Sequence, residues 1–171
     1  IKVLNLESIT NKKGETLCIS KNCSIEVYSN SNKLVGKYKI SNGAKIYKKD
    51  GDKVNKGDVL AEWDPYNIPI FALQDGIIEY KDLIENVSVK ERIVEQTGVS
   101  TKIIIDWKKS NTKELLKPSL IVIGNDGKKD ELETHDVYIN TILNVINNQE
   151  VECGDIIARI PHETTRSREI T

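Results

Sequence analysis

One short stretch of the chain occurs twice. Val54–Pro65 and Val151–Pro161 share the pattern Val-x-x-Gly-Asp-x-(Leu/Ile)-Ala, and each ends at a proline. In both copies Gly-Asp predicts a β-turn, because glycine reaches positive φ at little cost. The apolar residues that follow predict a short strand, which the proline ends because it cannot donate a ladder hydrogen bond. A duplicated unit therefore constrains the fold more than any single residue does.

The repeat extends beyond this motif. Ser24–Asn30 lines up with Ser119–Asn125 at an offset of 95 positions, against 97 at the Gly-Asp motif, a difference that a small loop insertion absorbs. Thr16–Ile19 likewise matches Thr101–Ile104. Two consecutive strand-rich units account for the whole length. We predict a first unit at residues 1–84, a second at 85–164 and a tail at 165–171.

Strand signals dominate the rest of the chain. Residues Val87–Gln96 fit both the helical and the strand period, so a helix stays open there, but Thr97–Gly98 interrupts the segment and favours a hairpin. Val137–Val145 reads as strand, and the polar, basic stretch 108–117 reads as a loop between the units. No amphipathic helix of three turns is apparent. The sequence predicts an all-β fold.

Composition excludes several classes of protein. Among 171 residues, 25 Lys and Arg balance 26 Asp and Glu, which leaves no overall drive toward nucleic acid or anionic membrane. No apolar run approaches the roughly 18 residues that span a bilayer. The amino end lacks the basic and long apolar segments of a signal peptide. Because the chain starts at Ile1 and stops at Thr171, we expect a piece of a longer protein.

The thiols and histidines form no recognisable site. Cys18, Cys23 and Cys153 are an odd number at no framework spacing, which is typical of free thiols in a reducing cytoplasm. A zinc site at the first two cysteines would need two further ligands, and His135 and His162 do not form a ligand pair with them.

Other candidate motifs also lack their chemistry. Asp50–Asp52 and Asp126–Gly127 do not continue into the ligand pattern of an EF-hand, so we interpret them as turns. His135 beside Asp136 has no nucleophile motif, which favours a solvated loop. Trp63 and Trp107 have no interleaved basic residues, which favours packing over base stacking. No glycine-rich phosphate loop is present. We therefore predict no catalytic, cofactor-binding or metal-binding residue.

The Gly-Asp motif with Pro69–Ile70 and Asp75–Ile78 resembles the barrel-sandwich hybrid of biotinyl and lipoyl carrier domains. Those domains present a modifiable lysine on a hairpin between two strands. The hairpin falls at Asp64–Asn67 here, and at Pro161–Glu163 in the second copy, and neither holds a lysine. The architecture can persist without the function. A degenerate carrier domain is kept as an alternative, which an intact mass without a lipoate or biotin adduct would eliminate.

A second resemblance covers nearly the whole chain. The segments that carry it are Tyr38–Ala44, Asp50–Val54, Gly57–Pro65, Pro69–Ile70, Gly76–Ile78, Gln96–Ser100 and Gly154–Thr171. In this order they resemble the large trigger-loop insertion in the beta-prime subunit of bacterial DNA-directed RNA polymerase, of the proteobacterial type. The final stretch, Ile160–Thr171, is the most specific part, although Glu169 stands where the family usually has Asp.

The resemblance implies two tandem sandwich-barrel hybrid domains, in agreement with the repeat. It implies a non-catalytic insertion in a cytoplasmic nucleotidyltransferase, which modulates trigger-loop folding and hence elongation, pausing and transcript cleavage. Implied partners are the rest of the subunit and the other polymerase subunits, with DNA and RNA met through the parent enzyme and no membrane. Implied magnesium and zinc sites lie elsewhere in the parent subunit, so we expect no cofactor in this chain.

Two alternatives concern surfaces. The chain could instead be an interaction module that docks transcription regulators near the secondary channel. The basic residues Lys108–Lys117 read as a solvated loop, with contact to nucleic acid or a polymerase surface as the alternative. Arg159, Arg166 and Arg168 precede the return to the trigger loop, and the resemblance makes them a hypothetical anchor.

Overall fold

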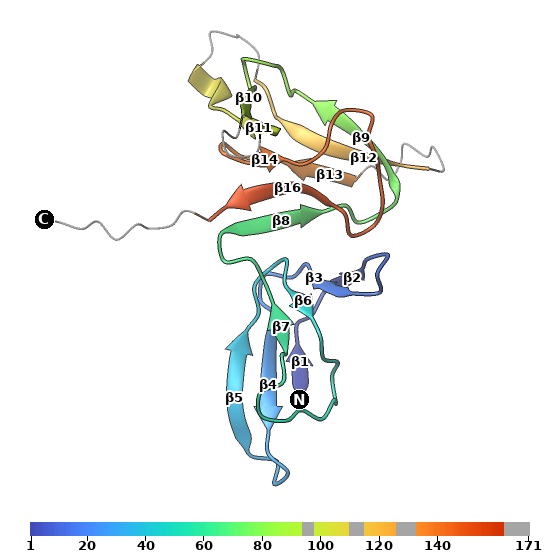
Figure 1. Ribbon diagram of the computed structural model, residues 1–171, viewed down its shortest axis with the longest axis vertical. Coiled ribbons are helices and arrows are strands. Elements are labelled where there is room, and N and C mark those ends of the chain that lie inside the picture. Colours follow the sequence, from blue (N-terminus) through green and yellow to red (C-terminus); the bar gives the residue numbers. More distant parts are fainter. Residues whose placement is uncertain (94–97, 110–114, 126–132, 163–171) are drawn as a thin grey trace, which may run out of the picture. The chain divides into compact units, whose positions relative to one another are not determined.

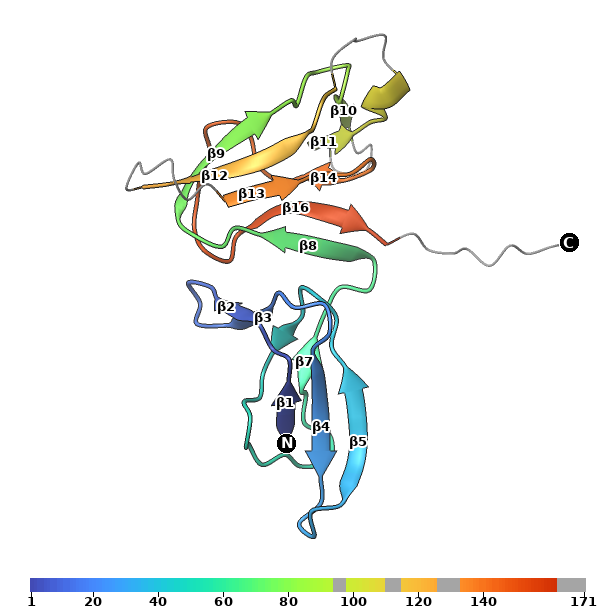
Figure 2. The same cartoon turned by 180° about the vertical axis from the view of Figure 1, so that it is seen from behind.

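The computed structural model describes residues 1–93, 98–109, 115–125 and 133–162 (Figures 1 and 2). These residues are almost entirely in strands, turns and loops, with one short 3-10 helix, so the all-β prediction is confirmed. The chain divides into two compact units, unit 1 at Ile1–Asp64 and unit 2 at Pro65–Thr171.

Unit 1 contains seven of the labelled strands: β1 (Lys2–Leu4), β2 (Ser8–Thr10), β3 (Thr16–Cys18), β4 (Ser24–Tyr28), β5 (Leu34–Lys39), β6 (Lys45–Ile46) and β7 (Ala61–Glu62). Unit 2 contains the rest: β8 (Asn67–Phe71), β9 (Gly76–Lys81), β10 (Val89–Ile93), β11 (Ser100–Ile104), the 3-10 helix η1 (Trp107–Lys109), β12 (Ser119–Gly124), β13 (Glu133–Asp136), β14 (Ile142–Leu143), β15 (Glu150–Val151) and β16 (Ile156–Pro161).

Each unit is built from two antiparallel sheets with matching strand orders. Unit 1 has the orders β1-β4-β5 and β2-β3-β6-β7. Unit 2 has the orders β9-β12-β13 and β10-β11-β14-β16, each extended by one strand, β15 beside β9 and β8 beside β16. In both views of unit 2, β8 lies alongside β16 (Figures 1 and 2). The barrel-sandwich hybrid description of these paired sheets stays a prediction.

The registers of the two units also match. The pair Lys45–Glu62 between β6 and β7 has its counterpart in the pair Ile142–Arg159 between β14 and β16, with both residues 97 positions later. The β4–β5 pairing matches the β12–β13 pairing in the same way, with the offset of 95 on the first strand. Strand β1 corresponds to β9, since they pair equivalently with β4 and β12. The paired strands of the two units therefore correspond residue by residue, and residues at matching positions are called counterparts below.

The Gly-Asp motif forms the same turn in both units. Gly57 has φ of 93° and Gly154 has φ of 90°, the left-handed region that glycine enters without a Cβ penalty. Asp58 Oδ2 accepts a hydrogen bond from the backbone amide three residues earlier, at 2.9 Å, and Asp155 Oδ2 does the same at 2.9 Å. The glycine thus permits the reversal, and the aspartate satisfies the first amide of the turn.

The cores occupy equivalent positions but differ in size. The unit 1 core consists of six buried residues: Cys18, Cys23, Ile25, Ile40, Ala44 and Ile46. Four of their unit 2 counterparts, Ile104, Leu120, Val137 and Leu143, lie in the unit 2 core, which is completed by Ala72, Ile78, Val89, Val122, Val145, Val151, Ile157 and Ala158. Of these additional residues, Val151 belongs to the added strand β15 and Ala72 directly follows the added strand β8, so the added strands contribute to the larger core of unit 2.

Three predictions of organisation differ from the structure. The units divide after Asp64, whereas the sequence placed the boundary at residues 84 and 85, because β8 and β9 pair with strands of unit 2. The described part of the 108–117 stretch connects β11 to β12 inside unit 2, so it is not a linker between units. The first residue of β3, Thr16, corresponds to Lys102 in the ladder and not to Thr101.

Among the smaller elements, one predicted hairpin is confirmed and one predicted strand is mostly absent from the described residues. The described residues of the 87–105 region form the strands β10 and β11, which pair as a hairpin, as predicted. Of the predicted strand Val137–Val145, only the two residues of β14, Ile142 and Leu143, form a strand. The predicted turn at Asp126–Gly127 lies outside the described residues.

Gly76 gives a direct test of this packing. A Cβ added there would lie 2.2 Å from the carbonyl oxygen of Ile123, so Gly76→Ala forces backbone movement between β9 and β12. We expect unit 2 to lose about 2–3 kcal/mol of unfolding free energy. Gly57→Ala is the control, because its added Cβ meets nothing within 4 Å. That variant carries only the positive-φ cost, about 1 kcal/mol.

The measurement is urea unfolding followed by tryptophan fluorescence. Trp107 reports unit 2 and Trp63 reports unit 1, since each unit contains one of the two tryptophans. A Gly76→Ala cost no larger than that of Gly57→Ala would show that β9 and β12 do not pack as closely as described.

Candidate functional site

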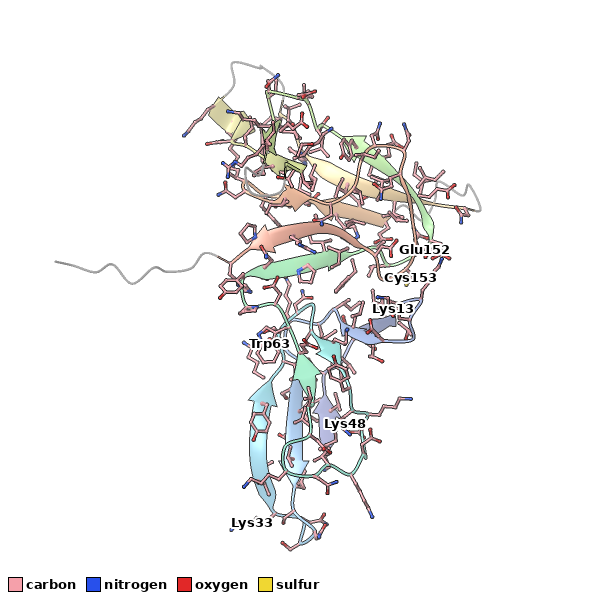
Figure 3. All side chains as sticks on the ribbon, in the orientation of Figure 1. Lys13, Lys33, Lys48, Trp63, Glu152 and Cys153 are labelled. Atoms are coloured by element: carbon pink, nitrogen blue, oxygen red, sulfur yellow. The ribbon has the colours of Figure 1, made fainter. Side chains whose placement is uncertain are left out.

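The repeated motif lines an open groove on unit 1. Residues Val54–Ala61 form one wall and residues of β5 form the other, around a cavity of about 840 Å³. Large apolar side chains are exposed along it: Val59 and Trp63 are 59% and 45% exposed. Figure 3 labels Trp63 on the segment that follows β7. Trp63 was predicted to pack in a core or between domains; its exposure shows that it does not lie in the unit 1 core, whereas Trp107 packs partly buried against the unit 2 core.

A second open cavity of unit 1, about 810 Å³, has a polar rim. Lys45 Nζ lies 2.7 Å from a carboxylate oxygen of Glu15, and hydrogen bonds from Lys45 and Asn11 lower the pKa of Glu15. Tyr47 donates to Glu62 at 2.6 Å, which raises the pKa of the Tyr47 phenol. These groups hold one another as ion pairs and hydrogen bonds, so they stabilise the rim and activate no nucleophile.

In unit 2 a tyrosine occupies the corresponding place. Tyr80 stands where unit 1 has Val3, and its hydroxyl donates to the carbonyl oxygen of Val145. Burial raises the pKa of this phenol. The cavity beside Tyr80 is only about 90 Å³. The larger unit 1 cavity therefore follows from a smaller side chain at an equivalent strand position.

A buried carboxylate oxygen lies on β13. Glu133 Oε1 accepts a hydrogen bond from the Leu73 amide at 2.7 Å and lies 2.5 Å from His135 Nε2. Glu133 Oε2 is buried and has no hydrogen-bond partner among the described residues. His135 was predicted to lie in a solvated loop beside Asp136; it lies instead in a strand and pairs with Glu133. Sequence reasoning missed Glu133, although residues two apart on a strand share one face.

Cys153 is near this group but is not activated by it. The thiol is half-buried in the Gly-Asp turn, next to Glu152 (Figure 3), and its amide donates to Asp75 Oδ1 at 2.8 Å. Burial, and then the charges of Asp75 and Glu133, raise the pKa of the Cys153 thiol. A nucleophilic cysteine needs the opposite shift, because the thiolate is the reactive form.

The remaining thiols belong to the unit 1 core. Cys18 and Cys23 are fully buried and unpaired with each other by a disulfide, in agreement with the prediction of free thiols. Burial and the neighbouring Cys18 raise the pKa of the Cys23 thiol to about 11. Both side chains act as small apolar core residues.

The described residues contain neither a metal-ligand cluster nor a membrane-spanning helix. Across residues 1–93, 98–109, 115–125 and 133–162, no three His, Cys, Asp or Glu side chains lie together as a metal site would require. Within the same ranges no helix has the length and apolar character to cross a membrane. Of the basic stretch, Lys109 forms an ion pair with Asp106 at 3.7 Å, and Lys117 donates its amide to Asp82. Arg159 lies exposed on β16, and Arg166 and Arg168 lie outside the described residues.

These features define a class: a pair of all-β units with matching strand orders, the first of which presents open grooves. No family model matches the chain. It aligns over 176 residues with the beta' subunit of DNA-directed RNA polymerase from Anaplasma marginale (strain Florida) at 37% identity. The corresponding subunits of Anaplasma phagocytophilum (strain HZ) and Ehrlichia ruminantium (strain Gardel) are 34% and 32% identical.

Each alignment covers 100% of this chain and 12% of the relative. The chain is therefore homologous to one segment of DNA-directed RNA polymerase beta' subunits and spans 12% of the length of these relatives.

Burial predicts the order in which the three thiols react. At pH 8 in the folded protein, we expect a thiol reagent to label Cys153 and to leave Cys18 and Cys23 unlabelled, because both are fully buried. Addition of urea should expose all three. Peptide mass spectrometry after a timed iodoacetamide pulse measures the site of labelling. Labelling of Cys18 or Cys23 as fast as Cys153 would contradict the described core.

The raised pKa of Cys23 predicts an alkaline loss of stability. Because the folded-state pKa of about 11 exceeds the usual value of 9.0, the stabilisation is complete below about pH 9 and is lost as pH rises toward about 11. We expect unit 1 to lose on the order of 2 kcal/mol over that range. Urea unfolding at several pH values measures it. Cys23→Ala is the control and should show a weaker dependence; an equal dependence would assign the effect to other groups.

Proposed function

We propose that the chain is a non-catalytic insertion in the trigger loop of a DNA-directed RNA polymerase beta' subunit. The observation that carries the proposal is the alignment of the whole chain with a segment that makes up 12% of that subunit. The order of the motifs from Tyr38 to Thr171 supports the trigger loop as its location. A segment this small with its own two folded units is typical of an inserted domain.

The proposed mechanism is mechanical. A folded body attached to a mobile loop changes the relative free energies of the loop's conformations, through its own contacts and through the constraint on the loop ends. A bias of about 1.4 kcal/mol changes the ratio of two conformations about tenfold. Such a bias is sufficient to alter pausing, elongation and transcript cleavage without any reacting group in the insertion. The residues that contact nucleotide would lie in the loop's arms.

The same proposal sets the partners and the setting. The chain would act in the bacterial cytoplasm, joined to the rest of the beta' subunit and in contact with the other polymerase subunits. DNA and RNA would be met through the parent enzyme, and magnesium and zinc would be bound elsewhere in the subunit. The balance of 25 basic and 26 acidic residues supports this, since it gives the chain no general affinity for nucleic acid.

Deletion tests the mechanical role. We expect a polymerase that lacks residues 1–165 of this segment to retain nucleotide addition and to differ in pause duration and transcript cleavage rate, because the loop folds without the attached body. Single-round transcription with the purified enzyme measures all three. Two versions of the deleted enzyme, in which glycine–serine linkers of different length replace the segment, serve as controls. An effect that is the same with both linkers comes from loss of the domain and not from strain where the chain is rejoined.

The deletion also discriminates between the proposals. Wild-type pausing and cleavage in the deleted enzyme would contradict the mechanical role. Unchanged intrinsic pausing combined with loss of the response to an added transcription regulator would favour the alternative, a docking module near the secondary channel. The exposed apolar groove of unit 1 is the observation that supports this alternative.

A further inference from the structure

A segment of unit 2 fills a position that is open in unit 1. Strand β8 adds to the outer edge of β16, and the chain then continues past the Gly-Asp turn before β9 begins (Figures 1 and 2). Gly154 donates its amide to the Ala72 carbonyl at 2.8 Å, and Ala72 donates its own to Asp155 at 2.9 Å. The carboxylate of Asp75 accepts from the Cys153 amide at 2.8 Å. The turn of unit 2 is therefore covered by backbone pairing.

The equivalent position in unit 1 is the 840 Å³ groove. Gly57 and Asp58, the counterparts of Gly154 and Asp155, both line it. In unit 1, β7 is the edge strand of its sheet. In unit 2 the equivalent strand, β16, has β8 hydrogen-bonded along its outer edge. The groove is thus the counterpart of the surface that residues 67–76 cover in unit 2.

Exposure along the two motifs supports this comparison. Ile157 and Ala158 of β16 are fully buried, whereas their unit 1 counterparts Leu60 and Ala61 are only half-buried. Val59 is 59% exposed, and its counterpart Ile156, which pairs with the added strand, is half-buried. An added strand can pair with an open strand edge and cover the exposed apolar side chains beside it, and the groove of unit 1 has both features.

We propose that this groove seats an extended strand of the same subunit, the stretch that leads directly into Ile1 in the longer polypeptide. In unit 2 the covering segment runs straight into β9, and the counterpart of β9 is β1. A segment joined to Ile1 therefore needs no additional chain crossing to reach the groove. The proposal requires only that the chain is part of a longer subunit; it does not depend on the trigger-loop location.

The unit 2 segment also defines the chemistry of the strand. Its residues 68–72, Ile-Pro-Ile-Phe-Ala, are all apolar and half-buried or buried, which predicts a continuous apolar run in the occupant. The counterpart of Gly76 falls two residues before Ile1, and there a glycine is expected, because in unit 2 a Cβ at Gly76 would lie 2.2 Å from a backbone oxygen. The residue three positions before Ile1 would be the counterpart of Asp75. An acceptor side chain there would accept a hydrogen bond from the backbone amide of Lys56, the counterpart of Cys153.

The test compares three proteins: residues 1–171, the same chain preceded by the eleven natural residues of its subunit, and the chain preceded by eleven glycine and serine residues. Only the natural extension should slow hydrogen exchange of the Gly57 amide, by about tenfold or more. Both extensions contain backbone carbonyl acceptors, but only the natural one has the apolar side chains that would hold a carbonyl against that amide. It should also reduce quenching of Trp63 fluorescence by acrylamide.

A substitution in the groove makes the assignment specific. Val59→Asp should leave the thermal midpoint of residues 1–171 nearly unchanged, since the side chain is exposed, but should cancel part of the protection that the natural extension provides. Equal exchange in all three proteins would overturn the proposal. Protection that requires no extension and rises with protein concentration would also overturn it, because a second copy of the chain would then occupy the groove. Neither outcome bears on pausing, so the trigger-loop proposal is tested separately.

Discussion

The hydrogen bond between the aspartate of the Gly-Asp turn and the amide that opens the turn is the interaction on which both units depend. It forms at Asp58 and again at Asp155, both at 2.9 Å. Each turn leads into the strand that pairs with β6 or β14, so the turn fixes the register of a central sheet. Glycine is needed in it because φ lies near 90° in both copies.

What distinguishes the units is the covering of this turn. Unit 2 has β8 and the Ala72–Gly154 pairing over its turn, and its core is correspondingly larger. Unit 1 has the same framework with an open groove, exposed apolar side chains and a core of six small or medium residues. The additional stability expected of unit 2 therefore comes from the backbone pairing of β8 and Ala72 with β16 and its turn. The residues that pair are far apart in the sequence.

The sequence predicted the elements that depend on local pattern. The repeat of Val-x-x-Gly-Asp, the turns and the all-β class follow from glycine, aspartate and alternating residues that are close together in the chain. The unit boundary could not be predicted in the same way, because β8 pairs with β16 across more than eighty residues. The Glu133–His135 contact and the groove at Trp63 likewise depend on which strand faces which, and period-two alternation does not encode that choice.

The central claim is that the two units share one framework and differ in whether the Gly-Asp turn is covered. Amide hydrogen exchange by NMR on residues 1–171 tests it most directly, by comparing the equivalent amides of Gly57 and Gly154 within one sample. The Gly154 amide, which donates to the Ala72 carbonyl at 2.8 Å, should be strongly protected, and the Gly57 amide should exchange fast. Equal protection of the two amides would contradict it.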